Sequence, residues 1–359
     1  MTTLHYWLAL FHLQNIGLRT IHRWHSSFPD ITNLFTATNE EREAKGISPE
    51  QNEALHTINM KLIETDLEWL QQQSHHHIVT FDDPAYPTLL REIYDPPILL
   101  FIRGNKNLLS NKQIAIVGAR NATVAGLKNA EFFAHQLVQA GYVITSGLAL
   151  GIDGAAHRGA LAGQGKTIAV CGTGLHETYP KSHRKLAEQM IAQDNAIISE
   201  FPLNTLPRAE NFPRRNRVIS GMSKGVLLVE ALVRSGSLIT ARHAMEQGRE
   251  VFAIPGSIHN PLTRGCHHLI RQGAKLVESV EDILEEFADH ARINAAETRA
   301  ELSAIEKKLL EEIGYEITPM DMILLRSGLT AGEVSSMLLR LELKGYIQSV
   351  SGGYIRELT

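Results

Sequence analysis

The segment QIAIVGARNATVAG, residues 113–126, restricts the fold of this chain more than any other stretch. Four apolar residues, Ile114 to Val117, predict a buried strand, and Gly118 lets the backbone turn sharply into a helix that begins near Thr123. A strand, a tight turn and a helix in this order form a phosphate-binding crevice in open α/β sheets, because the N–H groups at the helix N-terminus attract anions. The segment therefore predicts an α/β domain with an anion site at the carboxyl edge of its sheet.

The third residue of this turn distinguishes it from a dinucleotide site. The fingerprint G-x-G-x-x-G has glycine there so that the backbone can touch a pyrophosphate, whereas this chain has Arg120 after Gly118 and Ala119. A guanidinium reaches a phosphate that stays at some distance from the main chain. At this turn we therefore expect a phosphate of a nucleic-acid backbone rather than a buried NAD. We expect no cofactor.

Strand-like and helix-like segments alternate through the middle of the chain. After a strand at 78–81 and a second at 98–102, the expected strands are 114–117, 142–145, 167–171, 196–199, 226–229 and 250–254. The expected helices are 123–140, 153–162, 181–193, a helix near 214–222, 237–247 and 278–287. This alternation predicts an α/β fold with a parallel or mostly parallel sheet and helices on both faces, over residues 76–290.

Two smaller modules are expected at the ends of the chain. Residues 1–75 are helical by period, with short helices that resemble a SAM or helix-hairpin-helix module, a class that binds DNA or protein. Residues 304–359 predict helices and a small hairpin in the order of a winged helix-turn-helix. The charges on its expected recognition helix are mixed, so a protein-contacting role is at least as well supported as DNA reading. The polar, alanine-rich stretch 288–298 is expected to be a linker.

Composition limits the location and the partner of the protein. The short apolar run from Tyr6 to Phe11 has no basic region before it, so we expect neither a signal peptide nor a membrane span, and a cytoplasmic location. A formal net charge of −4 argues weakly against nucleic acid. The distribution of charge matters more, because cations gather in one segment that has few acids. These cations are Lys181, Arg184, Lys185, Arg208, Arg214, Arg215 and Arg217.

Four successive loops bring glycine turns or cations to one edge of the predicted sheet. After the G-A-R turn, Ser146 and Gly147 follow the next strand, and Asp153 is expected to cap the helix that comes after them. The third loop, C-G-T-G, leads through Tyr179-Pro180 to Lys181, and the fourth leads into the arginine-rich segment 214–217. Their recurrence after strands favours a shared anion site over scattered surface charges.

Metal and catalytic sites are not expected. His75, His76 and His77 are adjacent in the chain, and adjacent residues cannot converge on one ion without a contorted backbone, so we predict no metal there. The chain has no G-x-S-x-G elbow, and neither cysteine has a supported base. A base-stacking platform, which single-strand sites usually build from aromatic side chains, is not identified by the sequence either.

With these residues assembled, the chain closely resembles the DNA-processing protein A family (DprA, also called Smf). The matching motifs cover most of residues 78–285 in the family's order. They are I-V-G-A-R at 116–120, S-G-L-A-L-G-I-D-G-A-A-H at 146–157, G-T-G-L with Y-P at 172–180, S-E-F-P at 199–202, F-P-R-R-N-R-V-I-S-G-M-S at 212–223, V-E-A at 229–231, S-G-S-L-I-T-A at 235–241 and V-F-A-I-P-G at 251–256.

The resemblance implies an extended Rossmann-like domain that binds single-stranded DNA, forms a homodimer, and loads the RecA recombinase onto incoming DNA during natural transformation, without catalysis. Leu262, Leu269 and Ile270 are candidates for the dimer face. In the arginine-rich segment, the alternative to phosphate contact is that Asn216 or Arg217 supports the crevice structurally. The implied DNA-binding residues are Gly118, Ala119, Arg120, Ser146, Gly147, Lys181, Arg184, Arg214, Arg215 and Arg217.

A second hypothesis comes from a different class of protein. The related Rossmann-like branch that cleaves nucleoside monophosphates uses a P-G-G-x-G-T-x-x-E loop, in which the glutamate works beside a sugar phosphate. This chain offers Val229-Glu230-Ala231 and Ser235-Gly236-Ser237 in the corresponding region, without that loop. We therefore expect Glu230 to be a structural partner of a nearby helix end or arginine.

Overall fold

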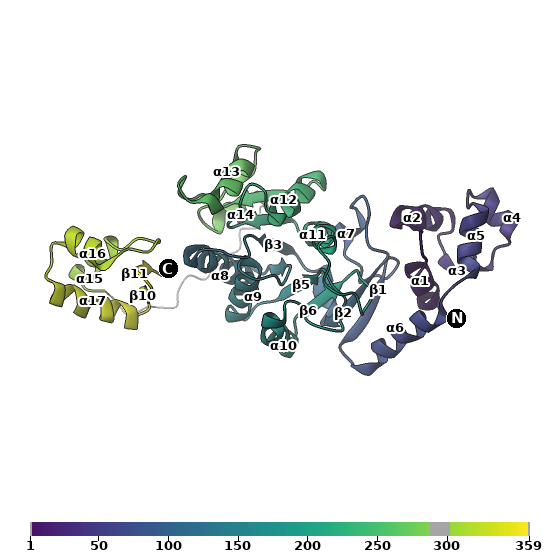
Figure 1. Cartoon of the computed structure of the whole chain (residues 1–359), viewed down its shortest axis with the longest axis horizontal. Coiled ribbons are helices and arrows are strands. Elements are labelled where there is room, and N and C mark those ends of the chain that lie inside the picture. Colours follow the sequence, from purple (N-terminus) through teal and green to yellow (C-terminus); the bar gives the residue numbers. More distant parts are fainter. Residues whose placement is uncertain (1, 288–301, 358–359) are drawn as a thin grey trace.

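The computed structural model describes residues 2–287 and 302–357 (Figure 1). Its centre is one nine-stranded sheet in the order β1-β2-β6-β5-β4-β3-β7-β8-β9. Only β2 runs against the others, because it pairs antiparallel with both β1 and β6 while the remaining neighbours pair parallel. The strands are β1 (His76–Thr80), β2 (Leu99–Gly104), β3 (Gln113–Val117), β4 (Val143–Ser146), β5 (Thr167–Cys171), β6 (Ala196–Ser199), β7 (Gly225–Leu228), β8 (Glu250–Ala253) and β9 (Lys275–Leu276). The expected mostly parallel sheet is confirmed, and the short edge strand β9 is an addition.

Helices cover both faces of this sheet. Successive side chains of a strand point to opposite faces, and both sets are buried in strands such as β3, so each face needs a covering layer. Along β3, Ile114 and Ile116 pack with α8 (Val124–Gln139), α9 (Ile152–Ala162) and α14 (Glu281–Glu286). Ala115 and Val117 point to the opposite face, and their cluster includes α7 (Thr88–Arg91), α11 (Asn211–Met222), α12 (Gly236–Glu246) and α13 (Arg264–Ile270). Helix α10 (Arg184–Ala192) and three short 3-10 helices complete the domain: η1 (Lys106–Ser110), η2 (Lys181–His183) and η3 (Pro261–Thr263).

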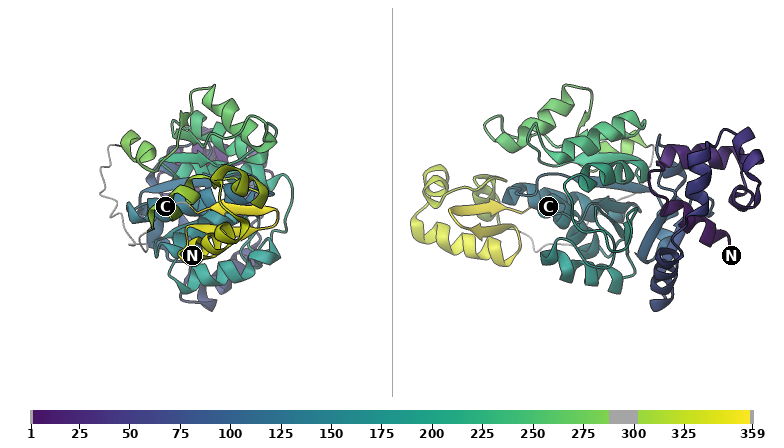
Figure 2. Two further views of the ribbon diagram at one scale, coloured as in Figure 1. Left: turned by 90° about the vertical axis from the view of Figure 1, so that its left-hand side faces the viewer. Right: turned by 45° about the vertical axis from the view of Figure 1, so that its right-hand side comes forward.

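The N-terminal helices share a hydrophobic core with the β1–β2 end of the sheet. They are α1 (Thr3–Phe11), α2 (Leu18–Ser27), α3 (Ile31–Thr36), α4 (Asn39–Ala44), α5 (Pro49–His56) and α6 (Met60–Gln72). Phe101 on β2 meets the rings of Phe11 and Trp69 edge-on, with centroids 5.5 and 5.7 Å away. His76 stacks on Trp69 at 4.1 Å, so this histidine has a packing role. In Figure 2 the helical module accordingly lies against that end of the sheet.

The C-terminal residues form a winged helix, as predicted. It contains α15 (Ala304–Glu311), α16 (Met320–Ser327), α17 (Ala331–Leu343) and the hairpin of β10 (Ile347–Val350) and β11 (Gly353–Arg356). Gly328 ends α16 with φ of 67°, the left-handed conformation that glycine adopts without steric cost, and so permits the turn into α17. The predicted linker at 288–298 lies outside the described residues. Within residues 2–287 and 302–357, no helix combines the length and the apolar character needed to cross a membrane.

Candidate functional site

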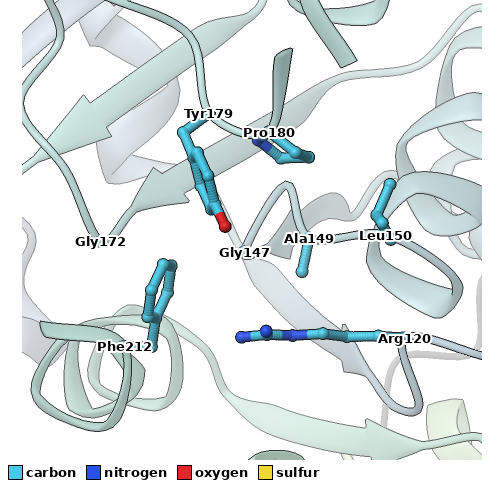
Figure 3. Close-up of a pocket in the computed structure, with 8 residues that line it drawn as sticks. All are labelled: Arg120, Gly147, Ala149, Leu150, Gly172, Tyr179, Pro180 and Phe212. Carbon is cyan, nitrogen blue, oxygen red and sulfur yellow. The ribbon is translucent and has the colours of Figure 1, made fainter. Parts of the chain in front are cut away.

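Three of the predicted loops meet at one pocket at the carboxyl edge of the sheet (Figure 3). The loops follow β3, β4 and β5, which are neighbours in the sheet, so their ends lie side by side. The pocket is open and has a volume of about 50 Å³, well below the 300 Å³ or more that is typical of sites enclosing a small molecule. It is lined by Arg120, Gly147, Ala149, Leu150, Gly172, Tyr179, Pro180 and Phe212.

Glu230 holds the G-A-R turn in place through hydrogen bonds to its carboxylate and to its backbone carbonyl. Its carboxylate accepts hydrogen bonds from the backbone N–H of Thr123 at 2.9 Å and from the Thr123 hydroxyl at 2.6 Å, at the start of α8. Its carbonyl oxygen accepts the N–H of Ala119 at 2.7 Å. Gly118 must be glycine, because a Cβ there would lie 2.6 Å from the Ile152 side chain and 2.9 Å from the Glu230 carbonyl. The expectation that Glu230 supports a helix end is confirmed, and the turn leaves Arg120 projecting into solvent.

Two aromatic rings face Arg120 across the pocket (Figure 3). The ring centroids of Tyr179 and Phe212 lie 5.8 Å apart at 42°, and the Arg120 guanidinium carbon is 5.2 Å from the Phe212 centroid. Tyr179 is 40% exposed, so its ring is available to a ligand. The sequence does not predict this pair, because the helix expected near 214–222 starts after Phe212, whereas α11 begins at Asn211 and holds Phe212 in its first turn. The aromatic residue ahead of the arginine run was the available signal.

The second loop is fixed by internal hydrogen bonds. The Ser146 hydroxyl donates to the carbonyl of Ile116 at 2.6 Å, and the N–H of Gly147 donates to the Asp153 carboxylate at 3.0 Å. The expectation that Asp153 caps α9 is wrong, because the N-cap is Gly151 and the Asp153 carboxylate binds N–H groups of the preceding loop. Burial raises the pKa of Asp153, and the neighbouring Arg215 and these N–H donors oppose that rise. Ser146 and Gly147 are both buried, so Ser146 fixes the loop from the interior, while Gly147 lines the pocket.

Arg215 and Arg217, two of the expected DNA-contacting cations, are buried in the protein, each about 4% exposed. Arg215 donates to the carbonyls of Gly147 and Val170, and Arg217 pairs with Glu200 and Asp95. A guanidinium held by these internal partners cannot reach a phosphate outside without losing them. The prediction of direct phosphate contact is therefore corrected for these two residues, and the supporting role that was the alternative for Arg217 fits the positions of both.

The remaining expected cations are on the surface near the pocket. Lys181 follows the lining residue Pro180 and is exposed. The side chain of Arg184 is 77% exposed and pairs with Glu188 at 3.0 Å. Arg214, two residues after Phe212, has a side chain that is 51% exposed. Arg120, Lys181 and Arg214 therefore gather at one edge of the sheet, as the sequence predicted.

Burial holds three other titratable groups, His157, Cys171 and Cys266, in their uncharged forms. Burial lowers the pKa of His157 to about 3, and its Nδ1 lies 2.7 Å from the hydroxyl of Thr167. Burial also raises the pKa of the Cys171 thiol to about 11 and that of Cys266 to about 12, so neither thiol is an activated nucleophile. Across the described ranges, no group of three His, Cys, Asp or Glu side chains is arranged to hold a metal ion.

Comparison with known proteins gives matches over most of the chain. The model of the family described as DNA recombination-mediator protein A matches residues 77–288, and that of the DprA winged helix domain matches residues 294–353. Protein Smf of Escherichia coli is 45% identical over 87% of this chain and 85% of its own length. The X-ray structure of DNA processing protein A from Streptococcus pneumoniae superposes with a TM-score of 0.68 at 40% identity, covering 80% of this chain and 98% of that one. A structure of DNA processing protein A from Helicobacter pylori, which concerns its single-stranded DNA binding mode, has a TM-score of 0.54 at 28% identity and covers 62% and 100%.

Proposed function

Because the chain belongs to the DNA recombination-mediator protein A family, we propose that it binds single-stranded DNA as a recombination mediator and leaves the strand chemically unchanged. The observation that carries this proposal is the convergence of Arg120 with the rings of Tyr179 and Phe212 at an open pocket. A cation beside two aromatic rings suits a strand that presents both phosphates and unstacked bases. The single-strand binding mode of the Helicobacter pylori relative points to the same ligand.

In this proposal the phosphates contact Arg120, Lys181 and Arg184, and a base stacks on the exposed face of Tyr179. Phosphate neutralisation of this kind does not depend on base sequence, because the backbone is the same at every nucleotide. Gly118 and Ala119 present the turn that carries Arg120. Four further residues of the predicted site, Ser146, Gly147, Arg215 and Arg217, act as supports that hold the loops in place.

The wider role that we propose is protection of incoming DNA and loading of RecA recombinase during natural transformation, in the cytoplasm, by a homodimer. A dimer would place two pockets on one strand and raise the overall affinity without a new kind of contact. Exposed apolar side chains offer a dimer face, because Leu232, Val233 and Ile258 are 49, 45 and 70% exposed on two loops. These loops are joined by a hydrogen bond from the N–H of Ala231 to the carbonyl of Leu262. Leu269, an expected member of the face, is only 1% exposed and belongs to the core.

We propose a division into a helical module at 1–75, a DNA-binding domain at 76–290 and a winged helix at 304–359. For the winged helix we propose a protein partner. Arg340 and Lys344, at the C-terminal end of α17, both pair with Glu306 of α15, at 3.5 and 3.0 Å. Cations that are held in ion pairs within the module add less to a phosphate-binding surface than cations that have no such partner.

The test is a comparison of single- and double-stranded DNA of the same sequence in a mobility-shift assay with the full chain. We expect a shift with the single strand at lower protein concentration than with the duplex, and an affinity that falls as salt rises. Equal or absent binding of the single strand contradicts the proposal. Incubation with nucleoside monophosphates addresses the enzymatic alternative, because release of free base would support a hydrolase. Glu230 does not favour that alternative, since its carboxylate is occupied by Thr123.

A further inference from the structure

A second and larger cavity lies between the helical module and the sheet. Its volume is about 260 Å³, close to the lower end of the range for small-molecule sites, about 300 Å³. Helices α1 and α2 with their connecting loop form one wall, and the start of β2 and the loop after β6 form the other. The lining residues are Phe11, Ile16, Gly17, Leu18 and Ile21 from the helical module and Pro97, Ile98, Leu99, Glu200, Phe201, Pro202 and Arg214 from the α/β domain.

This cavity lies on the same edge of the sheet as the pocket that contains Arg120. The order of strands places β6 next to β5, and β5 ends at the Gly172 turn of the first pocket. Because β2 runs antiparallel to β6, with Phe101 opposite Ser199, the start of β2 lies at the carboxyl end of β6. The first turn of α11 reaches both sites, since Phe212 lines the pocket and Arg214 lines the cavity. These two residues are two positions apart on the helix and their side chains leave it in different directions, so the two sites lie on different sides of the start of α11.

The walls of the cavity are mostly apolar and also carry one half-exposed cation, Arg214, and the buried carboxylate of Glu200. Phe11 and Phe201 supply aromatic surface, and the guanidinium carbon of Arg214 lies 5.3 Å from the centroid of Phe201. Arg214 also approaches Glu200, but at 3.6 Å this contact is looser than the buried pair that Arg217 makes with the same carboxylate. Because half of the Arg214 side chain is exposed, its N–H donors remain accessible at the rim. A flat, largely apolar ring attached to an anion matches these walls.

We propose that this cavity is a second nucleotide subsite for the same DNA strand, with the base between the helical module and the loop after β6 and its phosphate on Arg214. The inference rests on the proposed single-strand binding, and it makes the helical module one wall of the DNA site. Gly17 offers a way to fill the cavity. Its φ is −80°, and a Cβ added there meets no atom within 4 Å, so a larger side chain is accommodated without backbone strain.

The experiment is photocrosslinking of the full chain to a single strand that carries 5-iodouracil at each position in turn, followed by peptide mapping. We expect crosslinks to peptides that contain Phe11 or Phe201, in addition to those that contain Tyr179 or Phe212. Gly17→Phe removes the first set, keeps the second, and lowers the affinity for a long oligonucleotide by about ten-fold, as the loss of one stacked base predicts. Gly332→Phe on α17, another glycine with open surroundings, is the matched control and changes neither readout.

Crosslinks confined to Tyr179 and Phe212 in the wild-type protein overturn the second subsite and leave the proposed function standing. Crosslinks at Phe11 or Phe201 that persist unchanged in Gly17→Phe also overturn it, because the base then lies outside the cavity. A wild-type protein that binds no single strand overturns the proposed function, and the subsite with it.

Discussion

The buried guanidinium of Arg215 donates a hydrogen bond from Nη1 to the carbonyl oxygen of Gly147 at 2.7 Å, which joins α11 to the loop after β4. The same nitrogen donates to the carbonyl of Val170 on β5. Phe212, three residues earlier on the helix, thereby keeps a fixed position relative to the loops that bear Gly147 and Gly172. The position of the Phe212 ring therefore depends on the guanidinium of Arg215, which does not itself face the solvent.

We predict that Arg215→Ala lowers the free energy of unfolding by about 3 kcal/mol, because it removes the donor to the Gly147 and Val170 carbonyls and the positive charge beside the buried Asp153 carboxylate. The neighbouring Arg214→Ala, which removes a half-exposed side chain, should change it by less than about 1 kcal/mol. Urea unfolding followed by circular dichroism compares the two variants. Equal free energies of unfolding in the two variants would show that the internal contacts of Arg215 do not stabilise this edge of the sheet.

Arg120→Ala should weaken binding of oligo-dT by about ten-fold, as expected for the loss of one charge-assisted phosphate contact of about 1.5 kcal/mol. Lys181→Ala should have an effect of similar size. For each variant the slope of log affinity against log salt should become shallower by about 0.7, because one fewer counterion-displacing contact remains. Fluorescence anisotropy at several salt concentrations measures both quantities. The control is Arg242→Ala, an exposed arginine on α12 that lines neither site. If Arg120→Ala and Lys181→Ala both bind oligo-dT with wild-type affinity, the proposed location of the DNA site is wrong.

Tyr179→Ala should weaken binding by at least five-fold, because stacking of one base on an aromatic ring contributes about 1–3 kcal/mol. Tyr179→Phe keeps the ring and should bind as the wild type does. The salt slope should stay the same in both, since no phosphate contact is removed, and this separates stacking from the effect of Arg120. If Tyr179→Phe were as weak as Tyr179→Ala, the hydroxyl and not the ring would be the contact.

The sequence predicted the backbone of the site better than the partners of its side chains. The strand, turn and helix around Gly118 follow from local periodicity and glycine placement, and the gathering of Arg120, Lys181 and Arg214 follows from the geometry of parallel strands. Arg215 looked equivalent to Arg214 because its burial depends on Gly147, which is 68 residues away in the chain. Asp153 was misassigned for a related reason, because a carboxylate in the first turn of a helix can bind the preceding loop as well as cap the helix.

His157 makes the stability of the protein sensitive to acid. Burial holds its pKa at about 3 in the folded chain, whereas an unfolded histidine titrates near 6.5. Between these values the unfolded chain binds a proton that the folded chain does not, so the free energy of unfolding falls as the pH falls from about 6.5 toward 3. At pH 5 the loss from this residue is about 2 kcal/mol, the product of about 1.5 pH units and 1.36 kcal/mol per unit. His157→Gln should therefore show a smaller drop between pH 7.5 and pH 5 than the wild type, even if the substitution lowers stability at both. Urea unfolding at the two pH values measures the difference, and an identical drop in both proteins would mean that His157 is charged in the folded state.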